Sequence, residues 1–223
     1  MPPLRFCFIR SRFKALHIPV LATLLLAMPA EGQSSHRFNF SGGGGVPLPT
    51  ADASANFDTG WNLDFRGGFN VNRNLLADLD FSFNRWDLTN TALAHFGQPG
   101  GYGDVWSLSF TPMVRLSPRS PIDAYIVGGP GLYHRGLTLT QPTTFQTVFC
   151  DPFFGFCFPA IVQANQVVAS FSTYKAGFNA GGGLEFRLGA YGLKAFAEAR
   201  YNQMFTTHGP DLTFVPVTFG LRW

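Results

Sequence analysis

Hydrophobic and polar residues alternate along most of the chain after residue 35, with the period of two that is typical of β-strands. The clearest example runs from Gly60 to Val71, where Trp61 and Leu63 alternate with Asn62 and Asp64. Eight segments share this pattern: His36–Gly42, Gly60–Val71, Leu75–Leu88, Val105–Leu116, Ile122–Arg135, Thr173–Leu188, Leu193–Phe205 and a last strand from about Leu212. No stretch after residue 32 carries a sustained apolar stripe of helical period, so the pattern predicts an all-β fold.

Two places interrupt the alternation. Residues 42–45 are all glycine and are interpreted as the entrance to a loop. The third segment changes phase near Arg85 and Trp86, which predicts a bulge or the end of the membrane-spanning part of that strand. The connections alternate in length: Asn72–Asn74, Ser117–Pro121 and Gly189–Gly192 are tight turns, whereas Gly43–Thr59, Thr89–Asp104 and Gly136–Ser172 are long, and Thr207–Asp211 is shorter. This alternation predicts an eight-stranded antiparallel up-and-down transmembrane β-barrel.

The two ends of the chain agree with secretion to a membrane. An apolar run from Val20 to Ala27 is followed by the small-x-small pattern Ala30-Glu31-Gly32, and it is preceded by four basic residues, Arg5, Arg10, Arg12 and Lys14. We therefore expect residues 1–32 to be a cleaved signal peptide and residues 33–223 to form the barrel domain. The final sequence FVPVTFGLRW alternates and ends on an aromatic residue, as expected of a strand that closes a barrel.

Removing the leader changes the charge of the protein. The whole chain has 16 Lys and Arg against 13 Asp and Glu, but the leader contains four of the bases and one of the acids, so the remainder is formally neutral. Nothing in this balance favours nucleic acid as a partner. Lys175, Lys194, Glu185 and Glu198 are the remaining lysines and glutamates, which is few for a soluble surface. This scarcity favours a barrel with lipid outside over a soluble lipocalin-like barrel, whose apolar face lies inside.

Aromatic residues at strand ends support the same interpretation. Trp61, Trp86 and Trp106 fall at the ends next to the long connections, and Trp223 falls at the other end. Outer-membrane barrels carry two aromatic girdles, one at each membrane interface. The predicted interface aromatics are Trp61, Trp86, Trp106, Tyr174, Tyr201 and Trp223.

From the leader through the eight alternating segments to the terminal TFGLRW, the chain resembles the small outer-membrane β-barrel family that groups the OmpA transmembrane domain, OmpX and opacity-protein-like surface antigens. The resemblance rests on this pattern, on the GGPG and GGG segments and on the terminal aromatic. It implies a place in the Gram-negative cell outer membrane, contact with outer-membrane lipid and lipopolysaccharide, and insertion by the barrel-assembly machinery through the C-terminal strand. We expect a monomer.

The polar face of the strands would point into the barrel. An eight-stranded barrel is just wide enough for its own side chains, so charges of both signs there predict an ion-pair network that fills the lumen. A proton or ion path through the lumen is the alternative. The residues of the predicted network are Arg37, Asp64, Arg66, Asp78, Asp80, Arg115, Asp123, Arg135, Lys175, Glu185, Arg187, Lys194, Glu198, Arg200 and Arg222, and Arg222 is expected to pair with a lumenal acid.

The longest connection contains Cys150 and Cys157, which bracket DPFFGF. Two cysteines this close on an oxidising secretory route predict a disulfide that closes a small loop. The connection is also rich in phenylalanine. Two interpretations stay open: its flanks extend the neighbouring strands into a hairpin whose aromatics pack together, or it is a contact surface for lipopolysaccharide, a partner protein or another cell.

The sequence predicts no catalytic, cofactor-binding or metal-binding residues. His134 lies near a strand end beside Arg135 without an adjacent serine motif, and His95 and His208 lie in connections. The expected function is therefore a structural or surface-interaction role, adhesion-like and carried by the extracellular loops. The alternative is a narrow porin-like pore or a lipid-contacting transport barrel.

Overall fold

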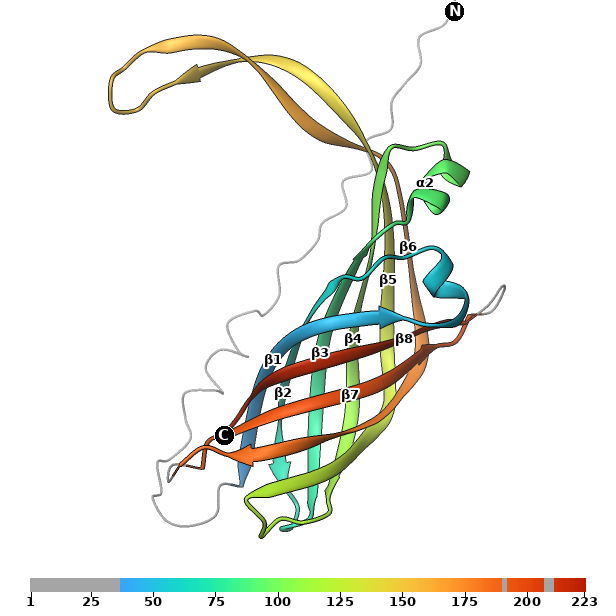
Figure 1. Ribbon diagram of the computed structural model, residues 1–223, viewed down its shortest axis with the longest axis vertical. Coiled ribbons are helices and arrows are strands. Elements are labelled where there is room, and N and C mark those ends of the chain that lie inside the picture. Colours follow the sequence, from blue (N-terminus) through green and yellow to red (C-terminus); the bar gives the residue numbers. More distant parts are fainter. Residues whose placement is uncertain (1–36, 190–191, 207–210) are drawn as a thin grey trace, which may run out of the picture. The chain divides into compact units, whose positions relative to one another are not determined.

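Eight antiparallel strands close into a barrel in the computed structural model, which describes residues 37–189, 192–206 and 211–223 (Figure 1). The strands are β1 (Phe38–Pro49), β2 (Trp61–Asn70), β3 (Leu75–Asp87), β4 (Gly100–Arg115), β5 (Ile122–Cys150), β6 (Cys157–Arg187), β7 (Lys194–Met204) and β8 (Leu212–Arg222). Each strand pairs with its sequence neighbour, and β1 pairs with β8. The predicted architecture is confirmed. The predicted signal peptide lies outside the described residues.

The alternation places the apolar side chains outside and the polar ones inside. In β3, Leu79 and Phe81 are 54% and 42% exposed, whereas the intervening Asp78 and Asp80 are fully buried. A lipocalin-like barrel would have the opposite arrangement, because its apolar face surrounds the ligand. An apolar exterior around a polar interior is the arrangement of a barrel that stands in lipid.

β1 is longer than predicted, because residues 42–45 belong to the strand and not to a loop. Gly45 pairs with Asn62 of β2 on one side and with Thr218 of β8 on the other. A Cβ atom on Gly45 would lie 1.9 Å from the carbonyl oxygen of Val217, so the strands approach here as only glycine allows. Four glycines carry no alternation, so the period could not reveal this part of the strand.

The prediction of a bulge in β3 is wrong, and the alternative, that the membrane-spanning part ends there, stays a prediction. The pairing of β3 with β4 is unbroken from Leu75 with Val114 to Asp87 with Tyr102. The change in the pattern arises because the inward position at the end of the strand is an apolar residue, Trp86, instead of a polar one. The loss of alternation therefore marks a change in what fills the barrel and not a change in the backbone.

The connections divide the barrel into two ends. Residues 71–74, 116–121 and 188–193 connect the strands at what we call the turn end, and residues 50–60, 88–99, 151–156 and 205–211 connect them at the loop end. A short 3-10 helix, η1 (Ala51–Ala55), and the helix α2 (Asn90–Phe96) lie in the first two loops. Among the described residues, no helix has the length and apolar character needed to cross a membrane.

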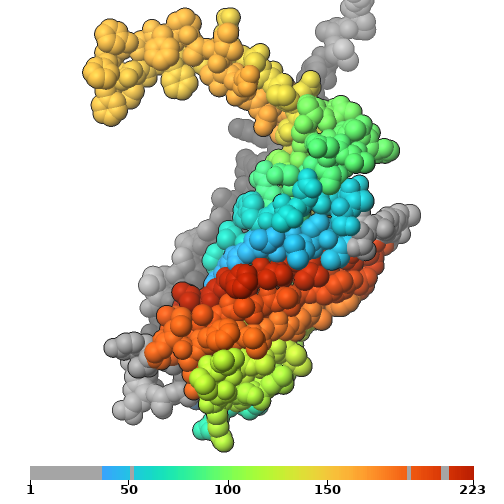
Figure 2. Space-filling model, in the orientation of Figure 1, coloured from blue at the N-terminus to red at the C-terminus, as the bar shows by residue number. Residues whose placement is uncertain are grey.

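β5 and β6 continue far beyond their other neighbours. β4 stops pairing with β5 at Thr140, and β7 stops pairing with β6 at Gly177, but β5 and β6 pair with each other as far as Cys150 and Cys157. Residues 141–166, which we call the arm, are therefore a two-stranded ribbon on their own (Figure 1). Figure 2 shows the arm in yellow and orange, as a narrow extension away from the rest of the barrel. The long connection is a hairpin that extends the neighbouring strands, which confirms this part of the first interpretation.

Candidate functional site

Two arginines and three carboxylates meet at the centre of the lumen. We call this group the central cluster, and it consists of Asp64, Arg66, Asp80, Glu198 and Arg200. The guanidinium of Arg66 donates two hydrogen bonds to Glu198, at 2.8 and 2.7 Å, and lies 2.7 Å from a carboxylate oxygen of Asp80. Arg200 donates to Asp80 at 2.9 Å and to Glu198 at 2.9 Å. No member is more than 4% exposed, so each charge depends on its partners instead of on water.

A second group of charges lies nearer the turn end, around Glu185. Its carboxylate accepts a hydrogen bond from Lys194 at 2.8 Å, pairs with Arg222, and lies 3.5 Å from Nε of Arg115. Arg115 is also 3.9 Å from Asp123. Glu185 is therefore the lumenal acid that pairs with Arg222 of the last strand. This contact connects β8 to β6 across the lumen.

The predicted lumenal charges divide into groups. Ten of the fifteen form ion pairs in the two clusters just described. Asp78 is buried and accepts a hydrogen bond from Asn39 at 3.0 Å, while Arg135 and Lys175 are partly buried. The prediction is wrong for Arg37 and Arg187, which are exposed. Arg37 precedes β1, and Arg187 ends β6 and donates to the carbonyl of Pro118 in the adjacent turn.

An apolar cluster closes the loop end of the lumen, and the sequence pattern did not reveal it. Trp86 lies at its centre, 3% exposed, with its ring centroid 5.0 Å from that of Phe214 and 6.0 Å from that of Phe57. Its indole N–H donates to the carbonyl of Pro47 at 2.8 Å. The mouth cluster consists of Ala53, Phe57, Trp86, Leu88, Ala92, Val105, Tyr133, Leu139, Met204, Leu212 and Phe214. The prediction of Trp86 as an interface aromatic is therefore wrong.

Side chains also fill the lumen at the turn end. Leu76 and Met113 are fully buried there and pack with Tyr125, whose hydroxyl donates to Glu198 at 2.8 Å. The ring of Tyr125 needs glycine beside it, because a Cβ atom on Gly183 would lie 2.6 Å from the phenol oxygen. The described lumen thus has an apolar layer at the loop end and the central cluster below it, while the turn end combines these apolar side chains with the ion pairs around Glu185.

The other predicted interface aromatics lie on the outside of the barrel. Trp61, Tyr174, Tyr201 and Trp223 are 47%, 58%, 39% and 57% exposed, and Trp106 is partly buried. Trp106 packs against Tyr174 of β6 and against His134 of β5, and the ring centroids of Trp106 and His134 are 5.2 Å apart. Their assignment to the two membrane interfaces stays a prediction.

The arm has an unusual surface for an exposed segment. Residues 137–172 contain a single charged residue, Asp151. The disulfide between Cys150 and Cys157 closes the tip, as predicted, and three phenylalanines inside it, Phe153, Phe154 and Phe156, are 90%, 75% and 71% exposed. Phe149 and Phe158 stack below the disulfide with centroids 6.5 Å apart, but most aromatics of the arm do not pack together.

The tip has a defined backbone. The side chain of Asp151 accepts hydrogen bonds from the N–H groups of Phe153 and Phe154, and its own N–H donates to the carbonyl of Phe156 at 2.8 Å. The exposed phenylalanines are thus held on a closed turn. Among the described residues, no group of three or more His, Cys, Asp or Glu side chains is placed to hold a metal ion.

Comparison with known proteins identifies the type of barrel. A family model described as "Outer membrane protein beta-barrel domain" matches residues 18–223. Similar solved structures include Neisserial surface protein A (12% identity, TM-score 0.55, 85% of this chain and 98% of that one) and a major outer membrane protein from Thermus thermophilus (11% identity, TM-score 0.50, 84% and 99%). The attachment invasion locus protein Ail of Yersinia pestis, solved with the heparin analogue sucrose octasulfate, is 16% identical, with a TM-score of 0.43 over 83% and 97% of the two chains. No curated protein matches the chain.

Proposed function

The chain belongs to the outer membrane protein beta-barrel domain family, and we propose that it acts as a surface-interaction barrel, whose closed body presents the arm to an apolar partner outside the cell. The observation that carries this proposal is the arm itself. It extends from β5 and β6, and Asp151 is the single charged residue in residues 137–172, which include the arm. The arm ends on three exposed phenylalanines. Contiguous exposed apolar surface of this kind typically marks an interaction site.

The filled lumen supports a structural body instead of a pore. A pore needs a continuous water column, but the central cluster and the mouth cluster occupy successive levels of the lumen with buried side chains. The alternative function, a narrow pore or a lipid-contacting transport barrel, would require these layers to move apart. Planar-bilayer recordings of the refolded protein test this point, and stable ion currents would contradict a closed body.

The family also supports the expected route and surroundings of the protein. Its members are outer membrane proteins. Our proposal includes a signal peptide at residues 1–32, insertion through the C-terminal strand, contact with outer-membrane lipid and lipopolysaccharide, a monomeric barrel and no catalytic activity.

The tip suggests how the contact is made. Burying one phenylalanine side chain stabilises a contact by about 1.5–3 kcal/mol before the cost of association is subtracted. Three such side chains on a turn closed by the Cys150–Cys157 disulfide can enter an apolar surface with little loss of conformational freedom. We therefore propose an apolar partner, such as the lipid of an opposing membrane.

The test uses the complete protein in nanodiscs and measures its co-flotation with neutral phosphatidylcholine vesicles. In an arm-less variant, Asn-Gly replaces residues 142–165, so that Gln141 and Gln166, which pair in the structure, flank a two-residue hairpin turn. A tip variant carries F153S, F154S and F156S, and the control F96S removes an exposed phenylalanine of α2. We expect the arm-less and tip variants to lose most of the co-flotation and the control to retain it. Equal co-flotation of the arm-less variant and the unchanged protein would refute the proposal.

A further inference from the structure

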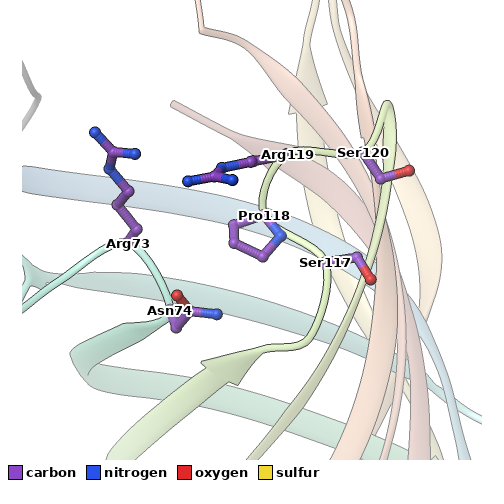
Figure 3. A pocket seen from close by; sticks show the side chains of 6 residues that line it. All are labelled: Arg73, Asn74, Ser117, Pro118, Arg119 and Ser120. Carbon is purple, nitrogen blue, oxygen red and sulfur yellow. The ribbon is translucent and has the colours of Figure 1, made fainter.

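Two adjacent turns at the turn end line an open basic pocket. The pocket has a volume of about 340 Å³ and is lined by Arg73, Asn74, Ser117, Pro118, Arg119 and Ser120 (Figure 3). Arg73 and Asn74 come from the turn between β2 and β3, and the other four come from the turn between β4 and β5. Figure 3 shows the guanidinium of Arg119 extending over Pro118 toward the side of the pocket where Arg73 lies.

The charges of this pocket are not balanced by nearby acids. Neither Arg73 nor Arg119 forms an ion pair with any residue in the described part of the chain, and both are exposed. The residues that line the pocket include no carboxylate, and their amide and hydroxyl groups can donate hydrogen bonds. Two arginines on one pocket without an anion repel each other, whereas a bound phosphate would satisfy both, since a guanidinium matches phosphate in shape and charge.

The carboxylates of the strand ends at the turn end already have partners. Asp123 is buried and accepts a hydrogen bond from the N–H of Ser117 at 2.8 Å. Glu185 is buried and forms ion pairs with Lys194 and Arg222. The exposed side-chain charges of the described turn end are arginines: Arg37, Arg73, Arg119 and Arg187. The loop end differs, because it exposes the acids Asp58 and Asp87. An anion is therefore favoured at the turn end specifically.

The pocket is held in shape by hydrogen bonds that do not involve its two arginine side chains. The side chain of Asn72 accepts hydrogen bonds at 2.8 Å from the N–H groups of Asn74 and Leu75. The amide of Asn74 donates to the carbonyl of Arg115 at 3.1 Å, which connects the two turns, and Arg187 donates to the carbonyl of Pro118. The backbone is thus organised before a ligand arrives, which lowers the cost of binding.

Exposed apolar residues border the pocket. Val71 precedes Arg73 and is 52% exposed, and Leu116 and Ile122, which flank the second turn, are 59% and 50% exposed. In outer-membrane barrels the short turns face the periplasm, so the pocket lies at the level of the lipid headgroups of the periplasmic leaflet. Arginine next to lipid-facing apolar residues is typical of a membrane interface.

We propose that this pocket binds the phosphate of an anionic phospholipid headgroup of the periplasmic leaflet, with Arg73 and Arg119 as its phosphate ligands and the acyl chains against Val71 and Leu116. The site does not depend on the arm or on its partner. Lipid bound at this site would give the barrel a preferred phospholipid at its turn end, and it would fix the depth of the turn end in the membrane.

The experiment measures lipid binding to the complete, refolded protein by native mass spectrometry in a neutral detergent. The probes are phosphatidylglycerol, phosphatidylcholine with the same acyl chains, and inorganic phosphate. The variants are R73Q, R119Q and R73Q/R119Q, and the control R85Q removes one arginine that stacks on Tyr102 away from the turns. Heat-modifiable migration on gels verifies that each variant retains a folded barrel.

We expect the protein to prefer phosphatidylglycerol to phosphatidylcholine, and R73Q/R119Q to lose roughly 30-fold in affinity for phosphatidylglycerol, with each single variant losing about fivefold. R85Q should retain full affinity, and 1 M salt should weaken binding to the unchanged protein. Unchanged affinity in folded R73Q/R119Q, or an equal loss in R85Q, would overturn the site. Displacement of phosphatidylglycerol by equimolar inorganic phosphate would overturn the assignment to a lipid.

Discussion

Replacing Arg66 should damage the barrel far more than neutralising one of its carboxylate partners. Arg66 is fully buried and lies within 3.0 Å of three acids, Asp64, Asp80 and Glu198. The variant R66M keeps a similar volume but leaves these three carboxylates with Arg200 as their remaining partner in the central cluster. Buried charges left without a partner in this way typically cost about 3–5 kcal/mol of stability.

Neutralising Asp64 leaves the central cluster with equal numbers of positive and negative charges. In D64N, Arg66 retains its two hydrogen bonds to Glu198 and its contact with Asp80, and the cluster then holds two cations and two anions. The substitution removes the charge that faces Arg66 at 3.0 Å and Arg200 at 3.7 Å, but the asparagine oxygen can still accept the hydrogen bond from Arg66, so the cost should be about 1 kcal/mol. The double variant R66M/E198Q should be more stable than R66M, because it removes one of the unpaired carboxylates.

Urea unfolding of the protein in lipid vesicles, followed by tryptophan fluorescence, measures these differences. A gap of about 3 kcal/mol between R66M and D64N corresponds to a midpoint difference of about 1–3 M urea. The control R37M removes an exposed arginine that has no ion-pair partner among the described residues and does not line the basic pocket, and should change stability by less than about 0.5 kcal/mol. If D64N unfolds as early as R66M, or if R66M matches R37M, the central cluster does not depend on the balance of charges described here.

Three further predictions concern other parts of the chain. W86A should lower the free energy of unfolding by about 3–5 kcal/mol, because it empties the mouth cluster, and the same urea assay measures it. The double variant C150S/C157S should leave the urea midpoint of the barrel unchanged, because the disulfide lies in the arm, where β5 and β6 no longer pair with β4 or β7. It should speed protease cleavage of the tip, because the disulfide closes the tip. G183A should cost about 1–3 kcal/mol, because its Cβ atom would lie 2.5 Å from a backbone carbonyl oxygen, whereas the control G42A, with a closest contact of 3.4 Å, should be tolerated.

The sequence revealed the strands wherever their two faces differ in chemistry. Membrane strands carry apolar residues outside and polar residues inside, so the period of two survives over most of the barrel strands and identifies the direction of Asp78, Asp80 and Glu198 correctly. It failed where the faces stop differing. Residues 42–45 have no side chains, and Trp86 is an apolar residue that faces inward, so the pattern suggested a loop and a bulge where the backbone is regular.

The candidate site was less accessible to sequence reasoning. The identity of most lumenal charges follows from alternation, but their partners come from strands far apart in the chain: Arg66 and Glu198 are separated by 132 residues. The basic pocket joins two turns that no sequence motif connects. A useful signal was nevertheless present, because arginine occurs in both of these turns without any acid.

Local chemistry alone therefore determined the membrane-barrel architecture, the number of strands, the outward and inward faces and the Cys150–Cys157 disulfide, since each depends on residue type and spacing. The tertiary structure decided the contacts. Closure of the ring brings β2, β3 and β7 around one lumen, where steric fit and charge balance select the partners of each side chain. It also decided that residues 141–166 form an arm, because the neighbouring strands end earlier and leave β5 and β6 to pair with each other.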